Sequence, residues 1–301
     1  MAAILVSGAS GLIGSAVVQS LEAGGVGIAR LLRPDSESTL FRAEIIRWDP
    51  AQPLSPDEVS GFDAVIHLAG ENIAGRWTTE KKARIRDSRV LGTRNLAQGL
   101  AQTKQKPRVF VCGSAIGYYG DRGDEILKET SAAGTGFLPD VCREWEAATQ
   151  AASDAGIRTV QLRTGVVLSA KGGALAKMLL PFKLGLGGRV GSGRQWMSWI
   201  DIEDMVGAIH HILKTDSLTG PVNLVDPKPV TNAEFTKTLA SVLRRPAIFP
   251  MPEFAVKLAF GEMGETVLLG SQRVEPAKLV ESGYPFRYGE LRKSIEANLH
   301  R

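Results

Sequence analysis

The stretch that decides the fold begins the chain and reads Ile4-Leu5-Val6-Ser7-Gly8-Ala9-Ser10-Gly11-Leu12-Ile13-Gly14. A short apolar run leads into three glycines at every third position, and apolar side chains then recur at helical spacing over residues 12–24. This order of strand, glycine turn and helix is typical of a turn that holds the pyrophosphate of a dinucleotide. We expect Gly8 to permit the turn, Gly11 to admit the phosphate and Gly14 to let the helix pack closely. A tight structural turn without a ligand is the alternative.

Apolar runs alternate with helical patterns through the first two thirds of the chain. Strands that are apolar almost throughout are buried on both faces, so the alternation predicts an α/β fold with a parallel, doubly wound sheet of the Rossmann type. The expected strands are 3–7, 26–32, 44–48, 63–69, 108–113, 158–163 and 221–225, and the expected helices are 12–24, 79–104, 138–155 and 201–214.

The remaining sequence predicts a second, smaller unit. Residues 169–200 are rich in glycine and carry cationic and aromatic side chains, which favours mobile loops around a phosphate or sugar ligand. Further helices are expected at 231–243, where Thr231 and Glu234 form a capping box, and near 253–260, 276–282 and 290–299. We therefore predict a dinucleotide-binding domain at 1–168, to which 200–225 return, and a small substrate domain at 169–199 and 226–301. Its candidate substrate contacts are Lys171, Arg189, Gln195 and Trp199.

Composition excludes several classes of protein. Of 301 residues, 44% are hydrophobic and 23% are charged, as in soluble globular proteins, and the net charge is only +4. The densest basic run, over 81–89, lacks interleaved aromatic residues, so a solvated helix face is favoured over a nucleic-acid surface. Two distant cysteines and four scattered histidines predict buried thiols and no metal site. With neither a leader peptide nor a membrane span, a reducing cytoplasmic setting is expected.

Arginines follow the second expected strand, where this architecture meets the adenosine ribose. An acid there would bind the ribose 2′-hydroxyl of NAD, whereas Arg33, with Arg30 close by, suits the 2′-phosphate of NADP. A surface arginine without a ligand is the alternative. Asp49 ends the third strand, where it would either contact the adenine amino group or form an Asp-Pro turn.

The next two strands end in small residues and a hydroxyl. Ala69 and Gly70 would let the cofactor lie against the backbone at the end of the fourth strand. At the end of the fifth, Ser114 would bind a substrate oxygen and Tyr119 would pass a proton. Alternatively, Ser114 caps a turn and Tyr119 packs beneath the loop.

These motifs resemble those of the extended short-chain dehydrogenase/reductase superfamily: the glycine turn, His67-Leu68-Ala69-Gly70, and Gly113-Ser114-Ala115 through Tyr119-Gly120. Leu162-Arg163-Thr164-Gly165-Val166-Val167-Leu168, Leu184-Gly185-Leu186-Gly187-Gly188, 191–200 and Asn232-Ala233-Glu234-Phe235 resemble its atypical YfcH-like branch, grouped with NAD(P)-dependent epimerases/dehydratases and nucleoside-diphosphate-sugar epimerases. The resemblance implies NADP(H) binding by Gly8, Ser10, Gly11, Leu12, Ile13, Gly14, Arg33, Leu68, Ala69, Gly70, Gly113, Arg163, Thr164, Gly165 and Val166.

The chain departs from this superfamily in its proton-transfer residues. Classical members use Tyr-x-x-x-Lys on a helix, where the lysine lowers the pKa of the tyrosine so that the phenolate can act as a base. None of the four tyrosines is followed by lysine at that spacing. Tyr119 is the first substitute and Glu144 the second, whereas Trp145 is expected to pack in the core.

The sequence therefore predicts an NADP(H)-dependent oxidoreductase or epimerase acting on a small polar substrate, with a nucleotide sugar as one candidate. The alternative is a non-catalytic sensor or interaction protein that binds the cofactor without turnover. A monomer or a homodimer is expected, without nucleic-acid or membrane partners.

Overall fold

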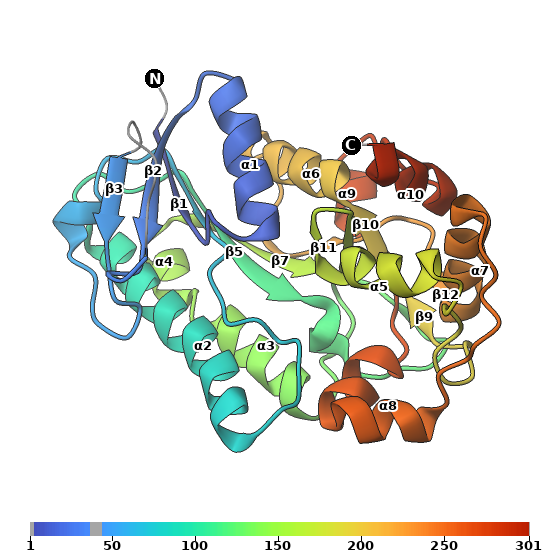
Figure 1. Cartoon of the computed structure of the whole chain (residues 1–301). Coiled ribbons are helices and arrows are strands. Elements are labelled where there is room, and N and C mark those ends of the chain that lie inside the picture. Colours follow the sequence, from blue (N-terminus) through green and yellow to red (C-terminus); the bar gives the residue numbers. More distant parts are fainter. Residues whose placement is uncertain (1–2, 37–43, 301) are drawn as a thin grey trace.

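A seven-stranded parallel sheet forms the centre of the computed structural model, which describes residues 3–36 and 44–300 (Figure 1). Its order is β11-β7-β5-β4-β1-β2-β3, so the direction of strand addition reverses between β1 and β4. A Rossmann-type sheet binds its ligand at this reversal, and the predicted fold class is confirmed. The strands are β1 (Ala3–Ser7), β2 (Gly27–Leu32), β3 (Glu44–Arg47), β4 (Ala64–His67), β5 (Val109–Ala115), β7 (Arg158–Thr164) and β11 (Gly220–Leu224).

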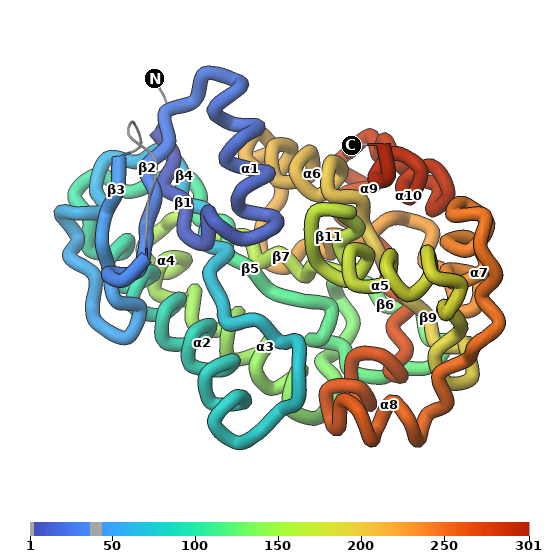
Figure 2. The backbone as a smooth tube through the Cα atoms, in the orientation of Figure 1, coloured from blue at the N-terminus to red at the C-terminus, as the bar shows by residue number. Residues whose placement is uncertain are grey.

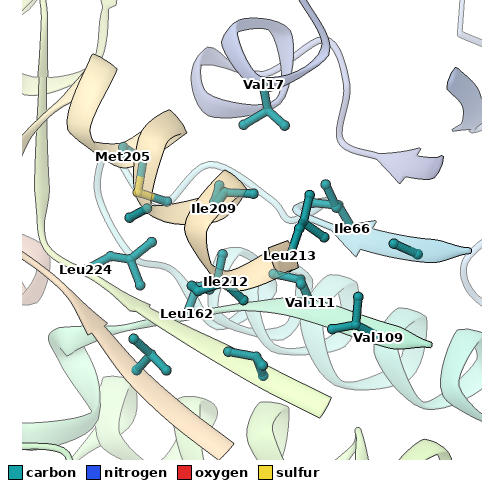
Figure 3. Packing of buried hydrophobic residues seen from close by; sticks show 14 of the residues in the cluster. Val17, Ile66, Val109, Val111, Leu162, Met205, Ile209, Ile212, Leu213 and Leu224 are labelled. Carbon is teal, nitrogen blue, oxygen red and sulfur yellow. The ribbon is translucent and has the colours of Figure 1, made fainter. Parts of the chain in front are cut away.

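Helices cover both faces of the sheet (Figure 1). On one face, α1 (Leu12–Ala23) and α6 (Ile202–Lys214) bury apolar side chains against β1, β4, β5, β7 and β11. Figure 3 shows Met205, Ile209 and Ile212 of α6 beside Val111, Leu162 and other strand residues. On the other face lie α2 (Thr79–Gln102) and α4 (Gln150–Asp154). Burial on both faces explains why the strands read as unbroken apolar runs.

The helix predicted at 138–155 is two helices, α3 (Phe137–Ala147) and α4. Thr149 lies between them and is buried, and its hydroxyl donates to the Glu146 carbonyl at 2.7 Å. The same hydroxyl accepts from Gln161 Nε2 at 2.8 Å, which ties this point of the chain to β7. A threonine that bonds locally competes with the helical backbone, so the helix breaks here.

The glycine-rich segment 169–200 is more ordered than predicted. It contains α5 (Gly173–Lys183), and its ends form two short ladders: β8 (Val166–Ser169) with β10 (Trp199–Asp201), and β9 (Trp196–Met197) with β12 (Val230–Thr231). Leu175, Leu179 and Phe182 of α5 enter a separate apolar core with Trp199 and Phe235. This burial stabilises α5. The many glycines around α5 make its apolar pattern hard to recognise in the sequence.

The segment of residues 232–300 packs beside the carboxyl edge of the sheet (Figure 2). It comprises α7 (Asn232–Leu243), with the predicted capping box at Thr231, then α8 (Glu253–Phe260), α9 (Ala277–Glu281) and α10 (Leu291–His300). It is tied back to earlier segments by β13 (Arg273–Val274), which pairs with β6 (Ile126–Leu127). Three irregular turns complete the elements, at Pro56–Val59, Ile116–Tyr119 and Gly264–Leu268.

Two of the acids at the start of α6, Asp201 and Asp204, stand where they could cap that helix. Asp201 does so, accepting from the Glu203 N–H at 2.8 Å. Asp204 instead accepts the N–H groups of Arg287 and Tyr288, both at 2.8 Å, and so fastens the C-terminal segment to the helix. None of the helices in residues 3–36 and 44–300 combines the length and apolar character needed to cross a membrane.

Candidate functional site

The glycine turn joins β1 to α1 at the point where the strand order reverses. Gly8 has φ +72°, and a Cβ there would lie 2.6 Å from the Leu68 carbonyl carbon of β4's end. A Cβ on Gly14 would lie 2.1 Å from the Gly8 oxygen, and the Gly11 N–H donates to that same oxygen at 3.0 Å. Gly8 and Gly14 therefore cannot carry side chains without a backbone shift.

The amino end of α1 offers hydrogen-bond donors that the protein does not use. Its N-cap is Gly11, no side chain caps it, and the first turn holds no acid. Uncapped N–H groups and the positive end of the helix dipole form an anion site. Ser10 and Gly11 are exposed, and Leu12 and Ile13 are half-buried around it. The turn thus fits a dinucleotide pyrophosphate, with contacts through the backbone of these four residues.

The two arginines beyond this turn have different surroundings. Arg33 follows β2 and is exposed, and its positive charge adds, after those of Lys81 and Arg84, to the lowering of the pKa of Glu71. Arg33 stands just beyond the carboxyl end of β2, where this architecture would place the 2′-phosphate. Arg30 instead pairs with Glu22 of α1 at 2.9 Å, so the structure argues against it as a phosphate ligand.

Asp49 is exposed after β3 and its Oδ1 accepts from the Ala51 N–H at 3.0 Å. This is the Asp-Pro turn that the sequence left open. Adenine contact by Asp49 stays a prediction.

Small residues end β4, and their contact with the cofactor stays a prediction. Leu68 and Ala69 are half-buried, and Gly70 is exposed. A Cβ on Gly70 would lie 3.2 Å from the guanidinium carbon of Arg89 on α2. Arg89 therefore reaches this edge of the sheet, and sequence reasoning missed it.

A buried ion pair occupies the carboxyl end of β5 and β7. Arg163, only 3% exposed, holds both carboxylate oxygens of Glu146, with Nε and Nη2 donating at 2.8 and 2.9 Å. Ser114 donates its hydroxyl proton to Glu146 Oε1 at 2.7 Å. Each of these two side chains already has Glu146 as an internal partner. This pairing argues against the predicted roles of Arg163 at the nicotinamide and of Ser114 toward the substrate. Thr164, Gly165 and Val166 are half-buried beside Arg163, and their cofactor contacts stay a prediction.

Tyr119, the first proton-transfer candidate, belongs to this network and does not face the cleft. It is fully buried, its hydroxyl donates to Asn223 Oδ1 at 2.7 Å, and it accepts from Arg163 Nη1 at 3.0 Å. Burial raises the pKa of Tyr119 to about 12, against the opposing effect of Arg163. A phenol with that pKa, enclosed in the core, is a poor base near neutral pH, so the structure corrects this prediction.

Glu144, the second candidate, is also engaged elsewhere: its carboxylate pairs with Arg86 of α2 at 2.6 Å, on the surface. Trp145 packs in the core as expected, and its indole N–H donates to Thr93 at 2.9 Å. Gly113 was predicted to touch the cofactor, but it is buried, and a Cβ there would lie 2.8 Å from the Trp145 ring. That glycine makes room for the indole.

Cys142 and Glu146 occupy α3 at a spacing of four, the spacing of the missing Tyr-x-x-x-Lys pair. Burial raises the pKa of the Cys142 thiol to about 12, so it is not a thiolate near neutral pH. The spacing was the one sequence signal for Glu146. The tyrosine–lysine motif does not include an acid, so it does not identify Glu146.

The four predicted substrate residues do not come together. Lys171 lines a cavity of about 820 Å³ beside Ser10 and Leu12, whereas Arg189 lines a different one of about 450 Å³ with Lys237. Gln195 is buried and donates to the carbonyls of Val190 and Leu268, and Trp199 is fully buried in the core. The last two are structural, so the prediction for them is corrected.

The basic run on α2 is largely neutralised. Lys81 pairs with Glu71 at 2.6 Å, Lys82 with Glu262 at 2.6 Å and Arg86 with Glu144. Such pairing suits a protein surface better than a nucleic-acid site. Within the described ranges, no three His, Cys, Asp or Glu side chains are placed to hold a metal ion.

Comparison with known proteins matches residues 4–224 to the NAD dependent epimerase/dehydratase family. The chain belongs to this family. Residues 251–297 also match a domain of unknown function, DUF1731. The resemblance predicted from the sequence motifs is thus confirmed, and the epimerase/dehydratase family match spans the whole central sheet.

Relatives in this family cover the full length of the chain. An epimerase family protein of Mycobacterium leprae is 39% identical over 98% of this chain and 94% of its own. The crystal structure of human epimerase family protein SDR39U1 with NADPH is 34% identical, with a TM-score of 0.89 and 99% of each chain covered. A nucleoside-diphosphate sugar epimerase from Corynebacterium glutamicum is 36% identical, with a TM-score of 0.81 over 99% of this chain and 58% of that one.

Proposed function

We propose that this chain binds NADP(H) and acts as an oxidoreductase or epimerase on a small polar carbonyl or alcohol, with nucleotide sugars as one substrate class. The observation that carries the proposal is the uncapped, acid-free amino end of α1 behind a turn in which Gly8 and Gly14 cannot bear a side chain. A human relative that matches the whole chain was crystallised with NADPH. Support for the 2′-phosphate comes from exposed Arg33.

Each part of the carboxyl edge has a role in this proposal. The N–H groups of Leu12 and Ile13 would hold the pyrophosphate, Arg33 the 2′-phosphate, and the backbone of Ala69 and Gly70 the ribose. When bound, NADP(H) supplies or accepts hydride at the nicotinamide. The substrate would enter between this edge and the C-terminal segment, the part proposed as the substrate domain. A cytoplasmic location and a monomeric or dimeric state stay predictions.

A cofactor-binding sensor is the second candidate, and Tyr119 is the observation that favours it. The tyrosine that the sequence assigns to proton transfer is enclosed in the core and bonded to Asn223 and Arg163. A sensor would bind NADPH and show no turnover on any carbonyl.

The cofactor claim is tested by titrating the intrinsic fluorescence with NADPH and NADH. We expect NADPH to bind more tightly, and Arg33→Ala to weaken NADPH by on the order of 10-fold while leaving NADH almost unchanged. Equal affinity of the unaltered protein for both cofactors would refute the role of Arg33. Following NADPH absorbance over a panel of carbonyls then separates an enzyme from a sensor.

A further inference from the structure

Arg89 places a cation at the carboxyl edge of β4 and β5. These two strands are paired, with His67 opposite Cys112. The guanidinium carbon of Arg89 lies against Gly70 just beyond β4 and 5.1 Å from the centre of the Trp145 ring. Trp145 in turn covers Gly113 near the end of β5. The charge therefore lies over β4 and β5, on the opposite side of the glycine turn from Arg33. In this topology, that side of the sheet receives the nicotinamide half of the cofactor.

Within the described part of the chain, no carboxylate lies within 4.0 Å of Arg89. The nearby acid Glu71 is held by Lys81 at 2.6 Å, and Glu144 is held by Arg86 at 2.6 Å. Glu146 is held by Arg163. Every acid around the guanidinium thus has another cation.

Only one hydrogen bond of Arg89 is internal: Nη1 donates to the Ile85 carbonyl of its own helix at 3.0 Å. Its other guanidinium nitrogens are not among the buried, unsatisfied polar atoms of the described residues, so solvent can reach them. Burial lowers the pKa of Arg89, which shows that the charge is held at a cost in hydration. A fork of N–H donors left without an acid partner is suited to binding a planar anion.

We propose that Arg89 binds a carboxylate of the substrate, next to the carbon that gains or loses hydride. This inference rests on the proposed function for its place in the reaction, but the anion site itself belongs to the chain alone. A single guanidinium provides one positive charge, which matches a carboxylate better than a dianionic phosphate or a nucleoside diphosphate. The substrate class is therefore a small 2-oxo or 2-hydroxy acid, or a sugar acid.

The test uses oxamate, a small carboxylate beside a carbonyl, and its neutral counterpart oxamide. Both are titrated calorimetrically into the full-length protein, with and without saturating NADPH. We expect oxamate to bind at least about 10-fold more tightly than oxamide, and Arg89→Gln to remove this preference. Arg89→Lys should keep part of it, because the charge remains while the fork is lost. The matched control is Arg94→Gln, which removes an exposed arginine from the same helix.

The outcomes separate the two proposals. Equal binding of oxamate and oxamide to the unaltered protein, or no oxamate binding at all, overturns the anion site, whatever the variants do. If Arg89→Gln weakens NADPH as much as oxamate, the guanidinium contacts the cofactor and the inference is wrong. Failure of NADPH to bind, or bound NADPH that is never oxidised, counts against the proposed function, while oxamate binding without cofactor still reports on Arg89.

Discussion

The two halves of the carboxyl edge are built in opposite ways. At the glycine turn, backbone donors are left unused: α1 has no side-chain cap, and its first turn has no acid. At the end of β5 and β7, the polar groups bond to each other: Ser114 and Arg163 both meet Glu146, and Tyr119 bridges Arg163 and Asn223.

This difference teaches where a ligand belongs. Unused donors at the surface are a site that a ligand completes, whereas a buried network that satisfies itself makes a rigid floor. Arg89 is the exception in the second half, because it keeps donors for the edge. We call the glycine turn the open half and the buried network at the ends of β5 and β7 the closed half. Four experiments test whether the two halves differ in stability and in ligand binding.

Breaking the closed half should have the largest effect. Arg163→Met leaves Glu146 without its cation inside the protein, and we expect the free energy of unfolding to fall by about 3 to 5 kcal/mol. Urea denaturation measures this. Arg86→Met is the matched control, since it breaks a surface pair with Glu144 whose loss costs about 0 to 1 kcal/mol. Similar losses in the free energy of unfolding for both variants would mean that the buried pair contributes no more to stability than the surface pair.

Filling the open half should remove cofactor binding instead. In Gly8→Ala the new methyl would lie 2.6 Å from the backbone of Leu68, so the turn must move. We expect NADPH affinity to fall on the order of 100-fold, or about 2.8 kcal/mol, measured by fluorescence titration. Gly25→Ala has a similar φ, +75°, with no atom within 4 Å of the new methyl. It controls for backbone strain and should leave NADPH binding unchanged.

The buried carboxyl of Asp226 allows a test by pH. This carboxyl follows β11, is 1% exposed, and its Oδ2 has no hydrogen-bond partner among the described residues. Burial raises its pKa from 3.8 to about 7, so between these values the folded chain keeps a proton that the unfolded chain loses. Its contribution to stability is therefore present below pH 4 and is lost as the pH rises to 7.

The measurement compares unfolding at pH 4 and pH 8. Asp226→Asn cannot ionise and keeps an oxygen for the Lys228 N–H. We expect the unaltered protein to lose more stability than the variant over this range, on the order of 2 to 4 kcal/mol. Parallel pH profiles of the two proteins would show that Asp226 ionises freely in the fold.

Tyr119→Phe should have the smallest effect. It removes the bonds to Asn223 and Arg163, while Arg163 Nη1 still donates to the Glu129 carbonyl at 3.1 Å. We expect a loss of about 1 kcal/mol in stability and no change in turnover on any carbonyl that is reduced. A loss of turnover of about 100-fold or more would restore Tyr119 as the proton donor.

The sequence was sufficient for the open half because all its requirements are local. A strand, three glycines and a helix lie within residues 3–23, and each acts on its chain neighbours. The role of Arg33 is predicted in the same way, from its place after a strand, and stays a prediction. The parallel sheet followed from unbroken apolar runs.

The closed half was missed because its residues meet only in three dimensions. Glu146 is on α3 and Arg163 on β7, and they meet because β7 is placed beside β5. Nothing local in Tyr119 shows that Asn223 of β11 accepts its proton. Arg89 is harder still, since its distinguishing property is that every neighbouring acid is held by another cation.

The return of β11 to the sheet has a consequence for how the chain is made. β7 gains its outer neighbour only after the segment containing α5 and α6 has left the ribosome. Until then the nascent chain carries a parallel strand with an unpaired edge, a template for association between chains. Premature termination ahead of Gly220 would make that edge permanent, so fragments of this protein should aggregate where the full chain folds.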